Sequence, residues 1–176
     1  IKTRDVLSSQ LSFSSHFGTH VDAPKHFLWT KSGIDKTSLN SLLGLFKVFE
    51  IKTTSQISKA DIHRLVINKG DRILFKTRNS KIITHKKFDS NFISLSLEAA
   101  QYLAKKQILL VGIDYFGIEA RGSKDHPVHR ALLSKNIAIV EGLNLSSVKS
   151  GLYSGAILPL KIKSGDAAPA RAVLWD

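Results

Sequence analysis

Residues 96–113 read Ser96-Leu-Glu-Ala-Ala-Gln-Tyr-Leu-Ala-Lys-Lys-Gln-Ile108-Leu-Leu-Val-Gly-Ile113. Ser96 is a favoured N-cap residue. The apolar side chains that follow it recur on one helix face: Leu97, Ala100, Leu103 and Ala104. From Ile108 onward the residues are continuously apolar, which is typical of a buried strand. A helix that leads straight into a buried strand is the building unit of an α/β domain.

The same alternation continues on both sides of this unit. Strands are predicted at residues 44–51, 71–77, 137–140, 156–162 and 170–175, and helices at residues 58–66 and 127–135. The chain has 176 residues, of which 43% are hydrophobic, and this suits one domain with a real core. We therefore predict a single compact α/β domain over residues 1–176, with a mixed β-sheet flanked by helices.

Composition limits the possible chemistry and location. Cysteine is absent, so a metal ion would be held by imidazole and carboxylate groups alone. No apolar run approaches the roughly 18 residues of a membrane span, and no secretory signal is evident, so we expect a cytoplasmic protein without a membrane partner. Because the chain starts at Ile1 and not at Met, we also expect that an N-terminal segment is missing.

The charge balance leaves two interpretations open. An excess of 26 Lys and Arg over 14 Asp and Glu gives a net charge of +12. This charge fits a nucleic-acid-binding or scaffold protein, but it also fits a lysine-rich solvated surface. The lysines are scattered and no Arg-rich arm occurs, which favours the surface interpretation and makes a nucleic-acid partner the weaker one. A positive field would still attract a small anionic substrate.

Three of the seven histidines fall in the segment His16-Phe-Gly-Thr-His20-Val-Asp22-Ala-Pro-Lys-His26. Gly18 and Pro24 disfavour a helix there. In an extended path His20 and Asp22 point to the same side, and a turn at Gly18 would fold His16 toward them. Such a cluster is a usual ligand set for zinc, manganese or iron. The alternative is a polar loop of hydrogen-bonded histidines, which three histidines and an aspartate in so short a segment make less favourable.

A second group of candidate ligands lies downstream. Glu141 ends an apolar strand, where a carboxylate needs a cation or several donors to offset its desolvation. His129 lies on the preceding helix, and a helix that returns into a strand brings the two side chains together. His126 begins the same helix, and it is either a neighbour of the site or the ligand in place of His129. We interpret His63 and His85 as solvated surface groups.

Taken together, these motifs resemble the cyclase family of metal-dependent hydrolases, whose best-defined members are bacterial kynurenine formamidases. The resemblance covers nearly the whole chain and rests on these segments: His16-x-Gly-Thr-His20-x-Asp22-Ala-Pro24-x-His26-Phe27, Gly112-Ile113-Asp114, His129-x-x-Leu-Leu133, Ile139-Val140-Glu141-Gly142, Leu158-Pro159-Leu160-Lys161 and Pro169-Ala-Arg171-Ala172. It implies a fold of the cyclase-like swivelling β/β/α type, assembled as dimers or tetramers. It also implies two divalent ions per chain, zinc in the formamidases and manganese in relatives that resemble isatin hydrolase.

The resemblance assigns a role to each candidate residue. His16, His20 and Asp22 resemble the ligands of one ion, and His129 resembles a ligand of the second. Asp22 and Glu141 resemble carboxylates that bridge the two ions, and His26 resembles the general acid/base. The chain departs from the family at Tyr115-Phe116, where relatives often have a small polar residue, and we expect this departure to affect substrate choice.

The leading hypothesis is therefore an arylformamidase-like amide hydrolase of tryptophan catabolism. It would convert N-formylkynurenine, or a similar anionic aromatic amide, to the free amine and formate through a metal-bound hydroxide, with His26 as the proton shuttle. A lactam- or lactone-opening hydrolase or cyclase on the same site is the alternative among enzymes. The alternative without catalysis is the basic nucleic-acid-binding or scaffold protein.

Overall fold

In the computed structural model, which describes residues 6–85 and 87–176, the main sheet closes into a barrel. The barrel strands are β1 (His20–Asp22), β2 (Leu43–Glu50), β4 (Arg72–Lys76), β6 (Leu110–Ile113), β7 (Ala138–Glu141), β8 (Gly151–Pro159) and β9 (Ala167–Trp175). A separate two-stranded sheet joins β3 (Gln56–Ile57) and β5 (Ser94–Leu95). The α-helices are α1 (Leu39–Leu42), α2 (Lys59–Ile62), α3 (Leu97–Lys106) and α4 (Pro127–Leu133). Short 3-10 helices cover Pro24–His26, Ile34–Lys36 and Arg78–Lys81.

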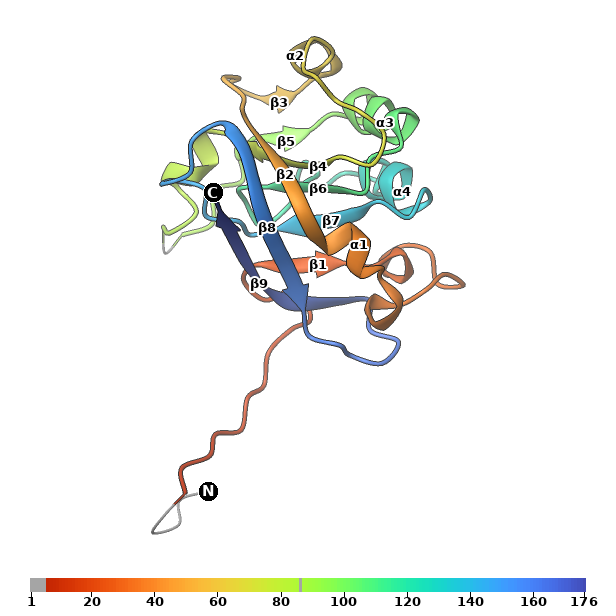
Figure 1. Cartoon of the computed structure of the whole chain (residues 1–176), viewed down its shortest axis with the longest axis vertical. Helices are drawn as coiled ribbons and strands as arrows, with labels where there is room; N and C mark the ends of the chain where they lie inside the picture. The colour runs from red at the N-terminus through yellow and green to blue at the C-terminus, as the bar shows by residue number, and fades with distance from the viewer. Residues whose placement is uncertain (1–5, 86) are drawn as a thin grey trace.

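The barrel contains both parallel and antiparallel pairs, in the order β1-β7-β6-β4-β2-β8-β9. Strands β2, β4, β6 and β7 run parallel, whereas β8, β9 and β1 join their neighbours antiparallel, which confirms the mixed sheet. In Figure 1, α3 and α4 lie along one flank of the barrel, and β8 and β9 cross the other. Closure depends on β1, which pairs with both β7 and β9.

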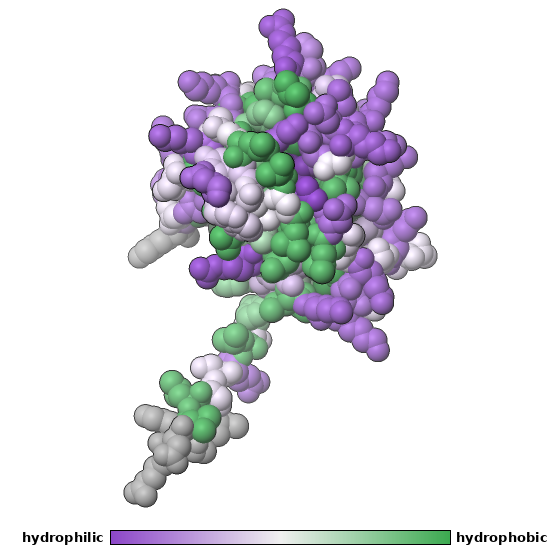
Figure 2. All heavy atoms as spheres, in the orientation of Figure 1, coloured by the Kyte–Doolittle hydropathy of each residue, from purple (hydrophilic) through white to green (hydrophobic). Residues whose placement is uncertain are grey.

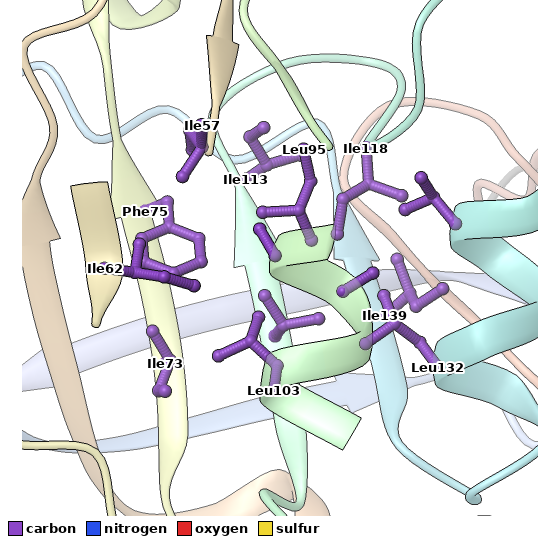
Figure 3. Packing of buried hydrophobic residues seen from close by; sticks show 14 of the residues in the cluster. Ile57, Ile62, Ile73, Phe75, Leu95, Leu103, Ile113, Ile118, Leu132 and Ile139 are labelled. Atoms are coloured by element: carbon purple, nitrogen blue, oxygen red, sulfur yellow. The ribbon is translucent and has the colours of Figure 1, made fainter. Parts of the chain in front are cut away.

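Strand alternation divides the apolar side chains between two cores. Leu74 of β4 points into the barrel, where it packs with Phe46 and Val140. Its neighbours Ile73 and Phe75 point the other way, toward the helices. Figure 3 shows this second core between strands and helices, with Ile73, Phe75, Ile113, Ile139, Leu103 and Leu132 labelled. The outer face of the barrel beside α3 and α4 is therefore buried.

The helix at 97–106 is confirmed with its Ser96 cap, but its buried face is rotated from the predicted one. Ala99, Ala100 and Leu103 are fully buried, whereas Leu97 is 37% exposed. The predicted helix at 58–66 is wrong in length, since α2 ends at Ile62 although its Ser58 capping box is present. A helix of one turn has little stability of its own, so its length depends on the tertiary contacts it makes.

Asp114 and Tyr115 follow β6, and both side chains are buried in the interior. The Asp114 carboxylate accepts hydrogen bonds from the backbone N–H and hydroxyl groups of Thr77 and Ser80. The Tyr115 ring is 1% exposed and stacks on Phe92, with 4.7 Å between the ring centroids. The Tyr115 side chain therefore fills a core cluster, and Phe116 beside it is exposed. An effect of this pair on substrate choice stays a prediction.

The described surface carries both hydrophilic and apolar side chains. On the face in Figure 2, hydrophilic side chains are spread around the body, with apolar side chains between them. The exposed apolar side chains of the barrel strands include Leu45 of β2, Leu152 of β8 and Val173 of β9. Among the described residues, no helix is long and apolar enough to cross a membrane.

Candidate metal centre

The alternation of β1 orients the first candidate ligands. Val21 packs inside the barrel, so His20 and Asp22 on either side of it point to the outer face. Gly18 adopts φ +65°, a left-handed conformation that glycine adopts without strain, and the turn there brings His16 back over β1. His16 Nδ1 lies 3.1 Å from Asp22 Oδ1, and His20 Nε2 lies 3.5 Å from the same oxygen. The predicted cluster of His16, His20 and Asp22 therefore assembles.

Strand pairing brings Glu141 to this cluster. His20 of β1 lies opposite Glu141 of β7, and His20 Nε2 is 3.4 Å from Glu141 Oε2. The next residue, Gly142, has φ +72°, and a Cβ atom there would lie 2.3 Å from the Gly18 carbonyl oxygen. The Thr19 hydroxyl also donates to the Gly142 carbonyl at 2.6 Å. Glycine at this position allows the two ligand segments to touch.

His129 on α4 completes the group from the other side. Its Nε2 atom lies 3.2 Å from Glu141 Oε1 and 3.9 Å from Asp22 Oδ2. The backbone N–H of Ile118 donates to Glu141 Oε1 at 2.6 Å and holds that carboxylate in place. The donor atoms of Asp22, His129 and Glu141 lie within 4.8 Å of one another, as do those of His16, His20 and Asp22. Asp22 belongs to both groups.

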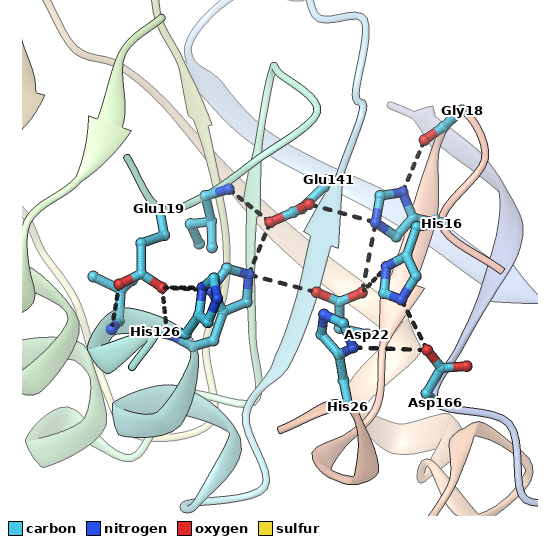
Figure 4. Close-up of polar contacts among 12 residues, drawn as sticks. His16, Gly18, Asp22, His26, Glu119, His126, Glu141 and Asp166 are labelled. Carbon is cyan, nitrogen blue, oxygen red and sulfur yellow. Dashed lines mark hydrogen bonds and ion pairs between the residues drawn. The ribbon is translucent and has the colours of Figure 1, made fainter. Parts of the chain in front are cut away.

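Two of these imidazoles are held on their outer side by the acceptors Gly18 and Glu119, both labelled in Figure 4. His20 Nδ1 lies 2.9 Å from the Gly18 carbonyl oxygen, which leaves Nε2 facing the carboxylates. His129 Nδ1 lies 2.6 Å from Glu119 Oε2, which again leaves Nε2 facing inward. A hydrogen bond at one ring nitrogen fixes which nitrogen is free to bind a metal ion.

His16 has the reverse orientation. Its Nε2 atom lies 3.0 Å from Asp166 Oδ2, and its Nδ1 atom faces Asp22. Burial lowers the His16 pKa, but the close contacts with the negative charges of Asp22 and Asp166 outweigh burial and raise it to about 9. Burial raises the Asp166 pKa, but the hydrogen bond with His16 outweighs it and leaves this pKa lowered.

The pKa values of His129 and Glu141 reflect the same close packing of opposite charges. Burial lowers the His129 pKa, but the hydrogen bonds with Glu119 and Glu141 outweigh it and raise the pKa to about 10. Burial favours a neutral Glu141, yet the hydrogen bond from His129 and the close approach of the His20 imidazole hold its pKa well below the ordinary value. Without an ion, protonated imidazoles therefore balance the buried carboxylates.

The donor set fits a bound cation. His20 Nε2 and both carboxylate oxygens of Asp22 are buried, and their contacts with neighbouring side chains, 3.1 to 3.9 Å long, include no hydrogen bond of normal geometry among the described residues. Leaving such atoms unpaired is costly unless a ligand satisfies them. Neutral imidazole nitrogens and carboxylate oxygens without thiolates are typical ligands for zinc or manganese.

His26 lies beside the cluster on the 3-10 helix Pro24–His26. Its ring centroid is 4.2 Å from that of His16 and 6.0 Å from that of His129. Burial and the neighbouring positive charges of His16 and His129 lower its pKa, although Asp22 opposes them. A lowered pKa keeps His26 neutral at pH 7 and able to accept a proton. The ring also packs on Phe27, at 4.1 Å between centroids.

The remaining histidines lie outside the cluster. His126 is 48% exposed, and its Nδ1 atom is 3.8 Å from Glu119 Oε2. It contacts no candidate ligand carboxylate, so the geometry favours His129 as the residue that faces the centre. His63 and His85 are exposed, as predicted.

Sequence reasoning missed two carboxylates, Glu119 and Asp166. Glu119 lies in the irregular segment after β6, and Asp166 follows Ser164-Gly165 just before β9. Neither residue lies in a periodic segment. The available signal was an acidic residue close in sequence to a strand end or to a ligand helix, which is a weak one.

Comparisons with known proteins agree with the interpretation of this cluster as a metal site. The model of the family "Putative cyclase" matches residues 3–120. Kynurenine formamidase of Salinibacter ruber is 36% identical over 167 residues, covering 94% of this chain and 78% of that protein. The structure of a predicted metal-dependent hydrolase from Bacillus stearothermophilus superposes with a TM-score of 0.87 at 42% identity, covering 99% of this chain and 83% of that one. Isatin hydrolase A from Labrenzia aggregata, at 23% identity and a TM-score of 0.74, shares the fold over 93% of this chain and 74% of its own.

Proposed function

Because the chain belongs to the Putative cyclase family, we propose that it is a metal-dependent hydrolase of arylformamidase type. The proposed reaction converts N-formylkynurenine, or a similar anionic N-formyl aryl amine, to the free amine and formate. The observation that carries the proposal is the convergence of three imidazoles on two carboxylates, with buried donor atoms left unpaired. Kynurenine formamidase activity in relatives such as that of Salinibacter ruber supports the choice of substrate.

In this proposal His16, His20 and Asp22 would hold one divalent ion, and Asp22, His129 and Glu141 would hold a second. Glu141 would be shared with the first ion as well, since it also contacts His20. Bound divalent ions would supply an activated water and polarise the substrate carbonyl. We expect zinc, with manganese as the alternative, and a dimer or tetramer in solution. Elemental analysis and light scattering of the purified protein test these expectations.

The protein's own residues would then move the proton. Hydrolysis of an amide needs a base for the attacking water and an acid for the departing nitrogen. His26 suits both steps, because its ring lies beside those of His16 and His129 and a neutral imidazole can accept a proton and return it. The hydrogen bond from Ile118 N–H to Glu141 keeps that carboxylate oriented while the proton moves. The net charge of +12 would attract an anionic substrate.

A screen of substrates tests the proposal directly. The protein, loaded with zinc or with manganese, is assayed on N-formylkynurenine, isatin and simple lactones, with the chelated protein as control. We expect metal-dependent release of formate from N-formylkynurenine. Opening of isatin or a lactone without formamidase activity would replace the proposal by the ring-opening alternative, which the shared fold of isatin hydrolase A accommodates. Salt-sensitive binding to bulk DNA by protein without metal would favour the basic binding protein.

A further inference from the structure

Asp166 lies in the turn between β8 and β9, far in sequence from the histidine segment that it contacts. It immediately precedes Ala167, the residue of β9 that pairs with Asp22. Its Oδ2 atom lies 3.0 Å from His16 Nε2 and 3.7 Å from His26 Nδ1. One carboxylate oxygen therefore faces both a candidate metal ligand and the candidate proton-transfer group (Figure 4).

The backbone around Asp166 is fixed by the segment that follows β1. The Ala23 N–H donates to the Asp166 carbonyl at 2.9 Å, and the Ile34 N–H donates to the Gly165 carbonyl at 2.8 Å. The Ser164 N–H donates to Asp35 Oδ1 at 3.0 Å. These bonds hold the turn against the strand end that leads to His26, so the position of the carboxylate does not depend on its contacts with the histidines.

We propose that Asp166 is a positioning residue that orients His16 toward the metal ion and His26 toward the substrate. This inference rests on the proposed function. The hydrogen bond at His16 Nε2 leaves Nδ1 directed at Asp22, as metal binding requires. The negative charge beside His26 Nδ1 orients that ring so that Nε2 is the nitrogen that exchanges protons with the substrate. Because one oxygen serves both rings, their relative placement is coupled.

The surroundings of Asp166 favour a positioning role over a role in stabilising the fold. Asp166 is 45% exposed and its side chain packs into no core, so removing it leaves no buried cavity. The turn keeps its backbone bonds to Ala23 and Ile34 without the carboxylate. Partners that orient metal-bound histidines typically contribute about 10-fold to 100-fold to metal affinity or activity.

The test compares Asp166→Ala and Asp166→Asn with the control Asp35→Ala. Asp35 binds the same turn through Ser164 but contacts neither His16 nor His26 in the described structure. Cobalt(II) serves as the probe, and its affinity and absorption spectrum are measured by titration of the metal-free proteins. Turnover on N-formylkynurenine is then measured at saturating metal, with kcat and KM determined separately.

For Asp166→Ala we expect cobalt affinity at one of two sites to fall about 10-fold to 100-fold with an altered spectrum. At saturating metal we expect a lower kcat with little change in KM. Asp166→Asn keeps an acceptor oxygen and should recover part of the affinity, and Asp35→Ala should bind cobalt as the wild type does. Wild-type affinity and spectrum in Asp166→Ala, or an equal loss in Asp35→Ala, would overturn the inference.

The two proposals fail in different ways. Cobalt binding does not depend on a substrate, so wild-type protein that binds cobalt but leaves N-formylkynurenine intact overturns the proposed substrate while the titration still tests Asp166. Wild-type protein that binds no cobalt overturns both.

Discussion

Glu119 Oε2 accepts a hydrogen bond from His129 Nδ1 at 2.6 Å, and the opposite nitrogen of the same ring faces Glu141 at 3.2 Å. Glu119 also accepts from the Val128 N–H at 3.1 Å and from the Ser123 hydroxyl at 2.8 Å. The carboxylate thus holds both the first turn of α4 and the ring that α4 carries. Orientation of His129 therefore depends on a residue outside the candidate ligand set.

We predict that Glu119→Gln weakens binding of one ion by about 10-fold to 100-fold. The amide is neutral and binds the His129 N–H less strongly than a carboxylate does. Titration of metal-free protein with zinc measures the effect. Glu98→Gln, on the first turn of α3, is the control and should bind zinc normally. Unchanged affinity in Glu119→Gln would show that α4 alone orients the ring.

Asp22→Asn should abolish metal binding at both sites, whereas His129→Ala should mainly weaken metal binding at one site. Asp22 contributes donor atoms to both groups, and His129 contributes to one. An amide offers a single weak acceptor oxygen in place of a bridging carboxylate. Elemental analysis of the purified variants gives the stoichiometry. Two ions retained by Asp22→Asn would contradict the bridging assignment.

Removal of metal should lower the melting temperature clearly. An ion that binds the folded chain and not the unfolded chain stabilises it by about 2.7 kcal/mol when present at 100 times its Kd. Calorimetry with and without a chelator, after verified metal loss, measures the difference. An unchanged melting temperature would mean that the cluster is not a preformed binding site.

The pH dependence of the metal-free protein extends this prediction. The pKa values of His16 and His129 rise from 6.5 to about 9 and about 10 on folding, so their paired protons stabilise the fold. A raised pKa gives stability that is complete below the unfolded value and is lost as pH rises through the folded value. The chelated protein should therefore lose melting temperature progressively from about pH 6.5 to about pH 10. The loaded protein should not follow this trend, because its ligand imidazoles are already neutral.

His26→Ala should leave metal content and fold intact but reduce turnover by about 100-fold to 10,000-fold, the usual contribution of a general acid/base. Metal stoichiometry, melting temperature and turnover are measured on one preparation. A parallel loss of metal would make His26 a ligand. A loss of stability with normal specific activity would make it a packing partner of Phe27, and normal turnover with full metal would exclude catalysis.

Asp114→Asn should lower the free energy of unfolding by about 2 to 4 kcal/mol without changing metal content. The carboxylate accepts four hydrogen bonds from Thr77 and Ser80, and an amide would turn an NH2 group toward some of these donors. Urea denaturation measures the loss. Asp89→Asn, whose amide oxygen can still accept the single bond from the exposed Asn91 N–H, should cost much less.

The elements with strong local patterns were predictable from sequence, and the long-range closures were not. The Ser96 cap and the apolar residues of β6 follow from local chemistry, and both are found. Strand β1 has only three residues, too few for a periodic signal, so its pairing with β7 and β9 was not predicted. The placement of His20 and Asp22 on one side was still predictable, because residues two apart in any extended segment point to the same side.

The candidate site shows the same division. Imidazoles crowded within one short segment are visible in the sequence, so His16 and His20 were identified. Asp166 contacts His16 across 150 positions of chain, and no spacing rule connects them. Glu119 is closer to its partner His129, but it lies in an irregular segment where side-chain direction cannot be derived from periodicity.

The short strand β1 also sets the order of events during biosynthesis. Its residues pair with positions 139–141 and 167–169, so an emerging polypeptide cannot complete the barrel until residues 167–169 have left the ribosome. Contacts this distant in sequence carry a large loop-closure entropy and form late. Metal uptake would therefore follow the pairing of β1 with β9, and a prematurely terminated product that lacks β9 would retain the histidines of the first segment without the framework that holds them together.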